Sequence, residues 1–255
     1  MLEYGRNNNK LFGGNMLFLC FSVKDRSNLV NDFSHYISNF GIKTWYDRKN
    51  IFLGDNRYET NINQGAKNDK IKYAIVFYSN NFINGNICLE EYKILQERYY
   101  KNEIHIFPVF LNNAMIYKDD RFKLCFELVY KVINSHDDFY GLALHIISKI
   151  CYDQLKLCKY KTIYEIITNV KSEHPLFKLL IEYDNIIKTN YQLRLGLLFS
   201  IFNLMELEID ILEQNKKIIN YIFHQNCINP LLEEKRELQI YEYIIIYELN
   251  RFVNL

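Results

Sequence analysis

The segment Met16-Leu17-Phe18-Leu19-Cys20-Phe21-Ser22 is an almost unbroken apolar run near the start of the chain. A run of this length without polar alternation is typical of a strand that is covered on both faces. Residues 28–40 follow with apolar side chains at helical spacing, and Gly41 ends that segment as a common C-terminal cap residue. A buried strand followed by an amphipathic helix predicts the first unit of a parallel sheet with helices on its faces.

The same alternation of strand and helix patterns continues to about residue 150. Strands that are separated by helices imply a parallel sheet, so the predicted fold class of this part is α/β with helices on both faces. Ligands of such sheets bind beyond the carboxyl ends of the strands. Phe21-Ser22, Asp47 and Ser79 stand at such ends. Further strands are expected at 43–46, 73–78 and 104–111, and further helices at 58–67, 88–100 and 142–151.

The distribution of glycine divides the chain. Eight of the nine glycines lie at or before Gly141, and only Gly196 lies beyond. The last part therefore has few turns, and its apolar stripes at helical spacing are typical of helices that pack around a core. We expect helical segments near 163–167, 174–183, 198–212 and 231–252. The predicted organisation is a flexible N-terminus at 1–13, an α/β domain at 14–150 and a smaller all-α domain at 151–255.

Composition excludes several classes of protein. Apolar residues make up 49% of the chain, which is enough to fill a core and argues against disorder. The net charge is +1 and basic residues are mixed with acids, so we expect no direct binding of nucleic acid. The six cysteines and six histidines show no metal-ligand spacing, which predicts no metal site. The cysteines stand mostly in apolar stretches, as expected for free thiols in a reducing compartment.

Two further observations concern location. The first 15 residues are polar and lack the apolar core of a signal peptide. The most apolar later stretch, residues 195–205, is too short to span a bilayer. We therefore expect a cytoplasmic protein without membrane contact.

Short motifs follow one another in a fixed order across residues 16–91. The first motif is the quoted apolar run, which is followed by Asp25. The second consists of Gly41-Ile42, Trp45-Tyr46-Asp47 and Gly54-Asp55. The third consists of Ser79-Asn80-Asn81-Phe82, Gly85, Ile87-Cys88 and Glu91. In this order and spacing they resemble a TIR (Toll/interleukin-1 receptor) domain of the prokaryotic NAD-consuming type. The resemblance covers about residues 14–150 and implies a flavodoxin-like fold. The helical part resembles no family that we can name.

The motifs depart from the family pattern at four positions. Cys20 and Gly85 replace serines, Phe21 replaces a tyrosine, and Ile87 replaces a tryptophan. By resemblance, Phe21 and Ser22 line the substrate site beside the nicotinamide ribose, and Ile87 stands in for an aromatic wall. Trp45 or Phe82 could compensate for the aromatic ring that is lost where Ile87 replaces the tryptophan. The residues expected to bind substrate are Phe21, Ser22, Trp45, Asp47, Gly54, Asp55, Phe82 and Ile87.

The segment around Gly54 corresponds to a mobile loop that shapes the site and mediates assembly in the family. Gly54-Asp55 is a turn in any interpretation, and whether the loop is functional stays open. Asp47 can equally be a capping or turn residue.

Glu91 stands where enzymatic TIR domains keep their catalytic glutamate. At about 100° per residue, Cys88, Tyr92 and Leu95 form one apolar stripe of the predicted helix. Glu90 then points nearly opposite that stripe, toward solvent, whereas Glu91 lies on its flank. A carboxylate at such a border can enter a cleft and still meet water. A glutamate in the first turn of a helix also simply favours the helix dipole, and the sequence leaves that alternative open.

Enzymatic members of the family cleave the nicotinamide–ribose bond of NAD+, and the resemblance implies NAD+ as substrate with no cofactor. Departure of nicotinamide leaves positive charge on the ribose, as in glycoside hydrolysis, and one carboxylate can stabilise it. The layout resembles prokaryotic antiphage effectors that deplete NAD+ when assembly activates them. Family behaviour also implies self-association through TIR domains, with the helical part as sensor, partner-binding or oligomerisation domain. Two alternatives remain: an enzyme that makes a cyclic ADP-ribose-type signal, and a non-enzymatic adaptor.

Overall fold

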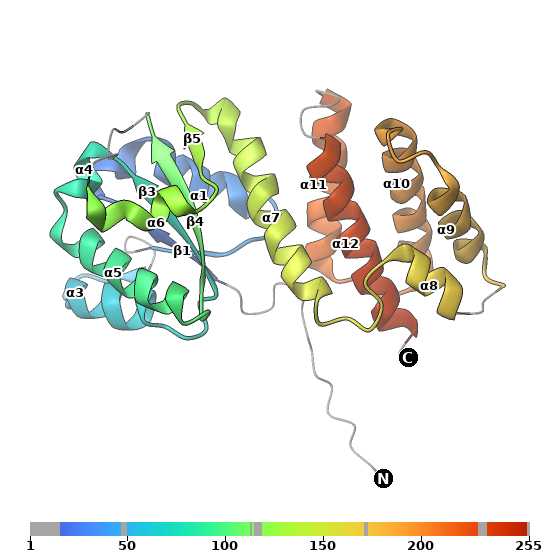
Figure 1. Ribbon diagram of the computed structural model, residues 1–255, viewed down its shortest axis with the longest axis horizontal. Helices are drawn as coiled ribbons and strands as arrows, with labels where there is room; N and C mark the ends of the chain where they lie inside the picture. Colours follow the sequence, from blue (N-terminus) through green and yellow to red (C-terminus); the bar gives the residue numbers. More distant parts are fainter. Residues whose placement is uncertain are drawn as a thin grey trace, which may run out of the picture. The chain divides into compact units, whose positions relative to one another are not determined.

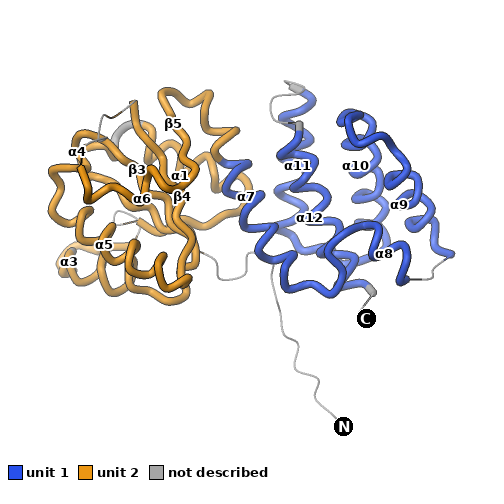
Figure 2. The backbone as a smooth tube through the Cα atoms, in the orientation of Figure 1, with its two compact units in different colours: residues 1–12, 143–255 blue, residues 13–142 orange. Residues whose placement is uncertain are grey.

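The computed structural model describes residues 16–46, 50–112, 114, 119–170, 173–228 and 234–253 of the chain. These residues divide into two compact units, one ending at Leu142 and the other beginning at Ala143 (Figure 2). The division falls inside helix α7 (Phe139–Leu155), whereas the sequence pattern places the boundary after residue 150. A helix that is continuous through the boundary carries no turn residue that would mark it.

The first unit contains a five-stranded parallel sheet with the order β2-β1-β3-β4-β5 (Figure 1). Cys20 at the end of β1 pairs with Val76 of β3, so the carboxyl ends of these two strands lie side by side. The predicted α/β fold is confirmed, and a fifth strand is added to the four expected ones. The strands are β1 (Leu17–Cys20), β2 (Thr44–Trp45), β3 (Tyr73–Tyr78), β4 (His105–Leu111) and β5 (Lys131–Ile133).

Helices connect these strands, and two of the connections contain wide, π-helical turns. The segment Arg26–Val30 leads into α1, and a second π-helical segment, η3 (Thr60–Ala66), continues α3. The helix expected at 58–67 is therefore present but mostly π-helical. Such segments are rare and occur frequently at functional sites. The helices of this unit are α1 (Asn31–Ser38), α3 (Arg57–Glu59), α4 (Asn80–Ile83), α5 (Asn86–Tyr100), α6 (Lys123–Glu127) and the start of α7.

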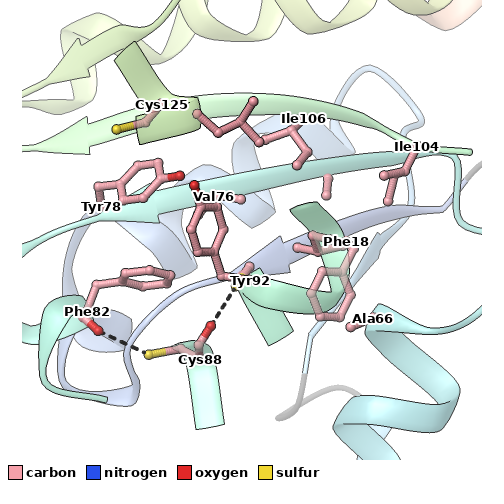
Figure 3. Close-up of a cluster of buried hydrophobic side chains, with 14 of the residues drawn as sticks. Phe18, Ala66, Val76, Tyr78, Phe82, Cys88, Tyr92, Ile104, Ile106 and Cys125 are labelled. Atoms are coloured by element: carbon pink, nitrogen blue, oxygen red, sulfur yellow. Dashed lines mark hydrogen bonds between the residues drawn. The ribbon is translucent and has the colours of Figure 1, made fainter. Parts of the chain in front are cut away.

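Both faces of the sheet are covered by helices, as expected. Phe33 of α1 packs against Phe77 of β3, with ring centroids 6.2 Å apart. Tyr92 of α5 packs against Tyr78, the next residue of the same strand, at 5.5 Å. Consecutive strand residues point to opposite faces, so α1 and α5 lie on opposite sides. Figure 3 shows the buried cluster on the α5 side, in which Phe18 also takes part.

The second unit is all-helical, as the sequence pattern predicts. Helix α12 contacts α8, α10 and α11, and its buried residues include Ile240, Ile244 and Leu249. We find no helix among the described residues whose length and hydropathy would suit a membrane span. Beyond α7, the helices are α8 (Ile163–Asn169), α9 (Pro175–Asn185), α10 (Tyr191–Glu208), α11 (Glu213–Ile228) and α12 (Glu234–Val253).

The segment expected as one stretch over 198–212 is interrupted. Helix α10 ends at Glu208, and α11 begins at Glu213. The backbone N–H of Leu212 donates to Oε1 of the buried Glu248 at 3.1 Å, which ties the start of α11 to α12. A tertiary hydrogen bond of this kind leaves no trace in the apolar pattern, which is why the break was not predicted.

Candidate functional site

A cavity of about 350 Å³ lies beyond the carboxyl end of β1. It is where a parallel sheet of this kind is expected to bind a ligand. We call its buried lining residues the floor and its exposed lining residues the rim. The floor consists of Leu19, Phe21, Ser22, Trp45, Asn61, Cys88 and Glu91, and the rim of Val23, Lys24 and Asn86.

The carboxylate of Asp25 fixes the turn that carries Phe21 and Ser22. It is buried, and it accepts hydrogen bonds from Oγ of Ser79 and, at 2.6 Å, from Nδ2 of Asn81. The backbone N–H of Asp25 donates to the carbonyl of Ser22 at 2.8 Å. The turn after β1 is thus joined to the turn after β3, and the first side of the floor is held in place.

Helix α5 supplies the opposite side of the floor. The thiol of Cys88 lies 3.2 Å from the carbonyl oxygen of Gly85 and 3.5 Å from that of Phe82, two acceptors for its S–H group. Figure 3 marks the contact with Phe82. A Cβ atom on Gly85 would lie 2.4 Å from this sulfur, so the glycine leaves room for the thiol in its present position. Ile87 and Glu91, one helical turn apart, both line the cavity.

Glu91 is 5% exposed and lies between two thiols. Burial, and then the charge of Glu91 and its hydrogen bond, raise the pKa of the Cys20 thiol well above its ordinary value. Burial and the same charge raise the pKa of Cys88 to about 12. Because a thiol reacts as its thiolate, neither cysteine is a nucleophile at neutral pH. The group in this floor that can carry negative charge at neutral pH is therefore the Glu91 carboxylate.

Glu90 lies outside the cavity lining. It is half-buried rather than turned fully to solvent as predicted, because its carboxylate accepts a hydrogen bond from the hydroxyl of Tyr58. The two neighbouring acids therefore have different surroundings. Glu91 belongs to the floor, and Glu90 is held by a residue of α3.

Five of the predicted site residues line the cavity together: Phe21, Ser22, Trp45, Ile87 and Glu91. The ring of Trp45 is stacked on Phe18, with centroids 5.1 Å apart and an interplanar angle of 26°. It therefore forms part of the floor, supported from below by another aromatic ring.

Phe82 does not line the cavity, so it cannot replace the missing aromatic wall. Its side chain is 0% exposed, and its ring packs against Tyr78 at 5.4 Å and Tyr92 at 6.1 Å. The backbone N–H of Phe82 donates to Oγ of Ser79, which caps α4. The cap begins a helical turn that directs the ring into the core.

Gly54 and Asp55 are also absent from the cavity lining. Gly54 has a φ of +97°, in the left-handed region that favours glycine. The Asp55 carboxylate accepts from the N–H of Phe52 at 2.8 Å. These contacts make the turn that the sequence predicts for Gly54-Asp55. Asp47 lies outside the described residues.

Seven of the lining residues were not predicted as site residues, and Lys24 and Asn61 are two of them. Lys24 carries positive charge at the rim, and its place two residues beyond Ser22 could have indicated it. Asn61 belongs to η3, is 4% exposed, and has a side-chain oxygen without a hydrogen-bond partner among the described residues. Nothing in the sequence distinguishes it from the polar residues around it. Within the described part of the chain, no group of three or more potential ligands could hold a metal ion.

Comparison with known proteins agrees with this architecture. A family model described as TIR domain matches residues 17–138. The TIR domain of the Toll-related receptor TRR-2 from Hydra magnipapillata is 18% identical, with a TM-score of 0.42, over 52% of this chain and 96% of that one. The TIR domains of the activated Roq1 resistosome, which directly recognises the pathogen effector XopQ, are 19% identical, with a TM-score of 0.41, over 53% and 99%. A search of curated proteins gave no match. The family match and the parallel β2-β1-β3-β4-β5 sheet show that residues 17–138 of this chain are a TIR domain.

Proposed function

We propose that this protein is a TIR enzyme that cleaves the nicotinamide–ribose bond of NAD+, with Glu91 as its catalytic residue. The observation that carries the proposal is the position of Glu91 in the floor of a cavity of about 350 Å³, beside Phe21 and Ser22. A carboxylate that is 5% exposed and still lines a cavity is placed to act on a bound ligand rather than on bulk water.

The chemistry needs little beyond this carboxylate. The electron pair of the bond between C1′ and the pyridinium nitrogen leaves with nicotinamide, which becomes neutral and needs no general acid. The ribose is left with positive charge, which the Glu91 carboxylate stabilises at short range. Water then adds to C1′ and releases a proton, so that NAD+ and water give nicotinamide, ADP-ribose and H+.

The charges around the cavity suit this substrate. Glu91 supplies negative charge in the floor, whereas Lys24 supplies positive charge at the exposed rim. NAD+ has the complementary distribution, a cationic nicotinamide riboside and an anionic pyrophosphate. Opposite potentials at the two parts of the cavity would orient the substrate with its nicotinamide end in the floor.

Nicotinamide release from NAD+ by the full chain tests the proposal. The assay is run in a crowding agent that forces self-association, because family behaviour implies that the site is completed by assembly. We expect Glu91→Gln to reduce turnover by at least about 100-fold, the typical effect of removing a group that stabilises transition-state charge. Glu90→Gln is the matched control, since it makes the same change one residue away and outside the cavity.

Turnover that survives Glu91→Gln would remove Glu91 from the mechanism. Turnover that is lost equally in Glu90→Gln would point to a general effect on α5. No turnover by the native chain under any assembling condition would favour the non-enzymatic adaptor, an alternative that Ile87 in place of a tryptophan keeps open.

The finer proposal is antiphage defence by NAD+ depletion, with TIR self-association as the activating step and the helical unit as sensor or partner-binding part. It is supported by the layout of one TIR domain and one helical unit. Chromatography of the products distinguishes ADP-ribose from a cyclic ADP-ribose-type signal, since both share the first bond cleavage. In cells, phage protection that is retained by Glu91→Gln would separate defence from NAD+ cleavage.

A further inference from the structure

Asn61 is a polar residue of the floor that the proposed mechanism does not use. It lines the cavity from η3, and it is 4% exposed. Its Oδ1 atom is buried and has no hydrogen-bond partner among the described residues. A buried polar atom without a partner is unfavourable for folding, so its presence at a cavity calls for an explanation.

The residues beside Asn61 limit the kind of ligand that could supply the missing hydrogen bond to its Oδ1 atom. Leu19, Phe21 and Trp45 are apolar or aromatic and share the floor with it, while Lys24 lies at the rim. An uncharged carboxamide in such surroundings can accept from an N–H group and donate to a carbonyl oxygen. A flat ring that bears its own carboxamide offers both partners, together with faces that suit the apolar walls.

Local packing holds Asn61 at this place. Gly65 follows one helical turn later in η3, and a Cβ atom there would lie 2.6 Å from the Phe18 ring and 2.7 Å from that of Trp45. The glycine therefore lets η3 approach the two stacked rings closely. Asn61 is consequently set beside the Trp45 part of the floor by packing rather than by a hydrogen bond of its own.

We infer that Asn61 is a specificity-determining residue that pairs its side-chain carboxamide with the carboxamide of the nicotinamide ring. The inference rests on the proposed function for the identity of the ligand. In this arrangement Glu91 acts on the ribose and Asn61 recognises the leaving ring. Nicotinic acid adenine dinucleotide, which has a carboxylate in place of the carboxamide, lacks the N–H donor and is discriminated against.

The test measures binding rather than turnover. Calorimetry of the full chain carrying Glu91→Gln, in the crowding agent, gives dissociation constants for NAD+, nicotinic acid adenine dinucleotide and ADP-ribose. The same measurements are made after adding Asn61→Leu, which keeps the branched side-chain skeleton but cannot form hydrogen bonds. We expect the preference for NAD+ over the acid analogue to fall about tenfold, the typical effect of one hydrogen bond to a ligand.

Two controls keep the result specific. Asn63→Leu makes the same change at an exposed position of η3 and should leave all three constants unchanged. ADP-ribose has no nicotinamide, so its binding should be the same with and without Asn61→Leu, which also shows that the variant is folded.

The outcomes separate this inference from the proposed function. An unchanged preference in Asn61→Leu, or equal weakening of ADP-ribose binding, overturns the role of Asn61 even if NAD+ is cleaved. A chain that binds NAD+ with an Asn61-dependent preference but never turns it over supports the inference and removes the enzymatic proposal. Failure to bind NAD+ at all overturns the inference.

Discussion

Two asparagines, one in each unit, are buried to the same extent and do different things. Asn61 of the TIR unit and Asn250 of the helical unit are each 4% exposed. Oδ1 of Asn250 accepts from the N–H of Tyr160 at 2.8 Å, and its Nδ2 donates to the carbonyls of Tyr160 at 2.9 Å and Ile246 at 2.8 Å. Asn61 lines the cavity, and its oxygen has no partner within the described residues. Burial alone therefore does not show what a polar residue does: Asn250 is bonded within its unit, whereas Asn61 lines a cavity.

The same contrast holds for the buried charges. In the helical unit, Nη2 of Arg194 donates to Glu242 at 2.8 Å and to the hydroxyl of Tyr183 at 2.6 Å, which joins α9, α10 and α12. In the TIR unit, Glu91 lines a cavity beside two thiols, which are weak donors. The ion pair of Arg194 thus connects helices, whereas Glu91 of the TIR unit lines a cavity.

The largest expected effect on stability comes from substitution of Asn250, whose side-chain oxygen and nitrogen both form hydrogen bonds. Asn250→Leu would leave the N–H and carbonyl of Tyr160 without their partner inside the helical unit. We expect the free energy of unfolding to fall by about 3 kcal/mol, the combined effect of several buried groups that lose hydrogen bonds. Urea denaturation measures it, with Asn203→Leu at an exposed position of α10 as control. A fall no larger than that of the control would contradict the structural role of Asn250.

A pair of glycine substitutions compares packing in the two units. Gly65→Ala would bring a Cβ atom within 2.8 Å of three ring atoms of Phe18 and Trp45. We expect a loss of about 2 kcal/mol, as for overpacking of a filled core. Gly196→Ala in α10 meets nothing within 4 Å and should instead stabilise its helix by about 1 kcal/mol. Thermal unfolding of both variants would show opposite shifts; shifts of the same sign would refute this comparison.

Substitution of Asn61 is expected to change the free energy of unfolding by less than Asn250→Leu does, and in the opposite direction. Asn61→Leu removes a buried oxygen that has no hydrogen-bond partner and adds apolar contact with the floor. We expect the unfolding free energy to rise by about 1 kcal/mol. Differential scanning calorimetry without ligand is the measurement. A lower melting temperature would indicate that Asn61 supports the fold, and the contrast with Asn250 would be lost.

The smallest expected effect is the pH dependence that Glu248 gives to the stability of the helical unit. Glu248 is fully buried, and burial raises the pKa of its carboxyl above the ordinary value of 4.5, against the lowering influence of Arg251 and Asn215. A carboxyl with a raised folded-state pKa stabilises the fold at low pH, and this contribution is lost as pH rises through that pKa. The unfolding free energy of the native chain relative to Glu248→Gln should therefore fall as the pH rises above 4.5. A difference that is constant or grows with pH would show that the pKa is not raised.

The central strands of the sheet could be predicted because they are continuous apolar runs. Residues 73–78 were predicted as a strand, and β3 occupies those residues. Strand β5 was not predicted because its three residues, Lys131 to Ile133, begin with a charged side chain and do not form an apolar run. The π-helical form of η3 was also missed, since the spacing of apolar residues does not reveal how the backbone hydrogen bonds are made.

The candidate site was predicted where it depends on helical spacing and not where it depends on tertiary contact. Glu91 could be distinguished from Glu90 because one residue turns a helix by about 100°. Phe82 was predicted to bind substrate, and the structure places its ring in the core, next to a capping bond from its N–H to Ser79 that cannot be seen in the sequence. Asn61 became recognisable only from its burial and its missing partner.

The two edges of the sheet are formed by β2, with two residues, and β5, with three. Strands this short expose too few backbone groups for another chain to extend the sheet by edge-to-edge pairing. Copies of this protein that associate would thus meet through helix and loop side chains. Such a contact can be reversed by a few substitutions or by a ligand, whereas a continuous intermolecular sheet would be hard to undo.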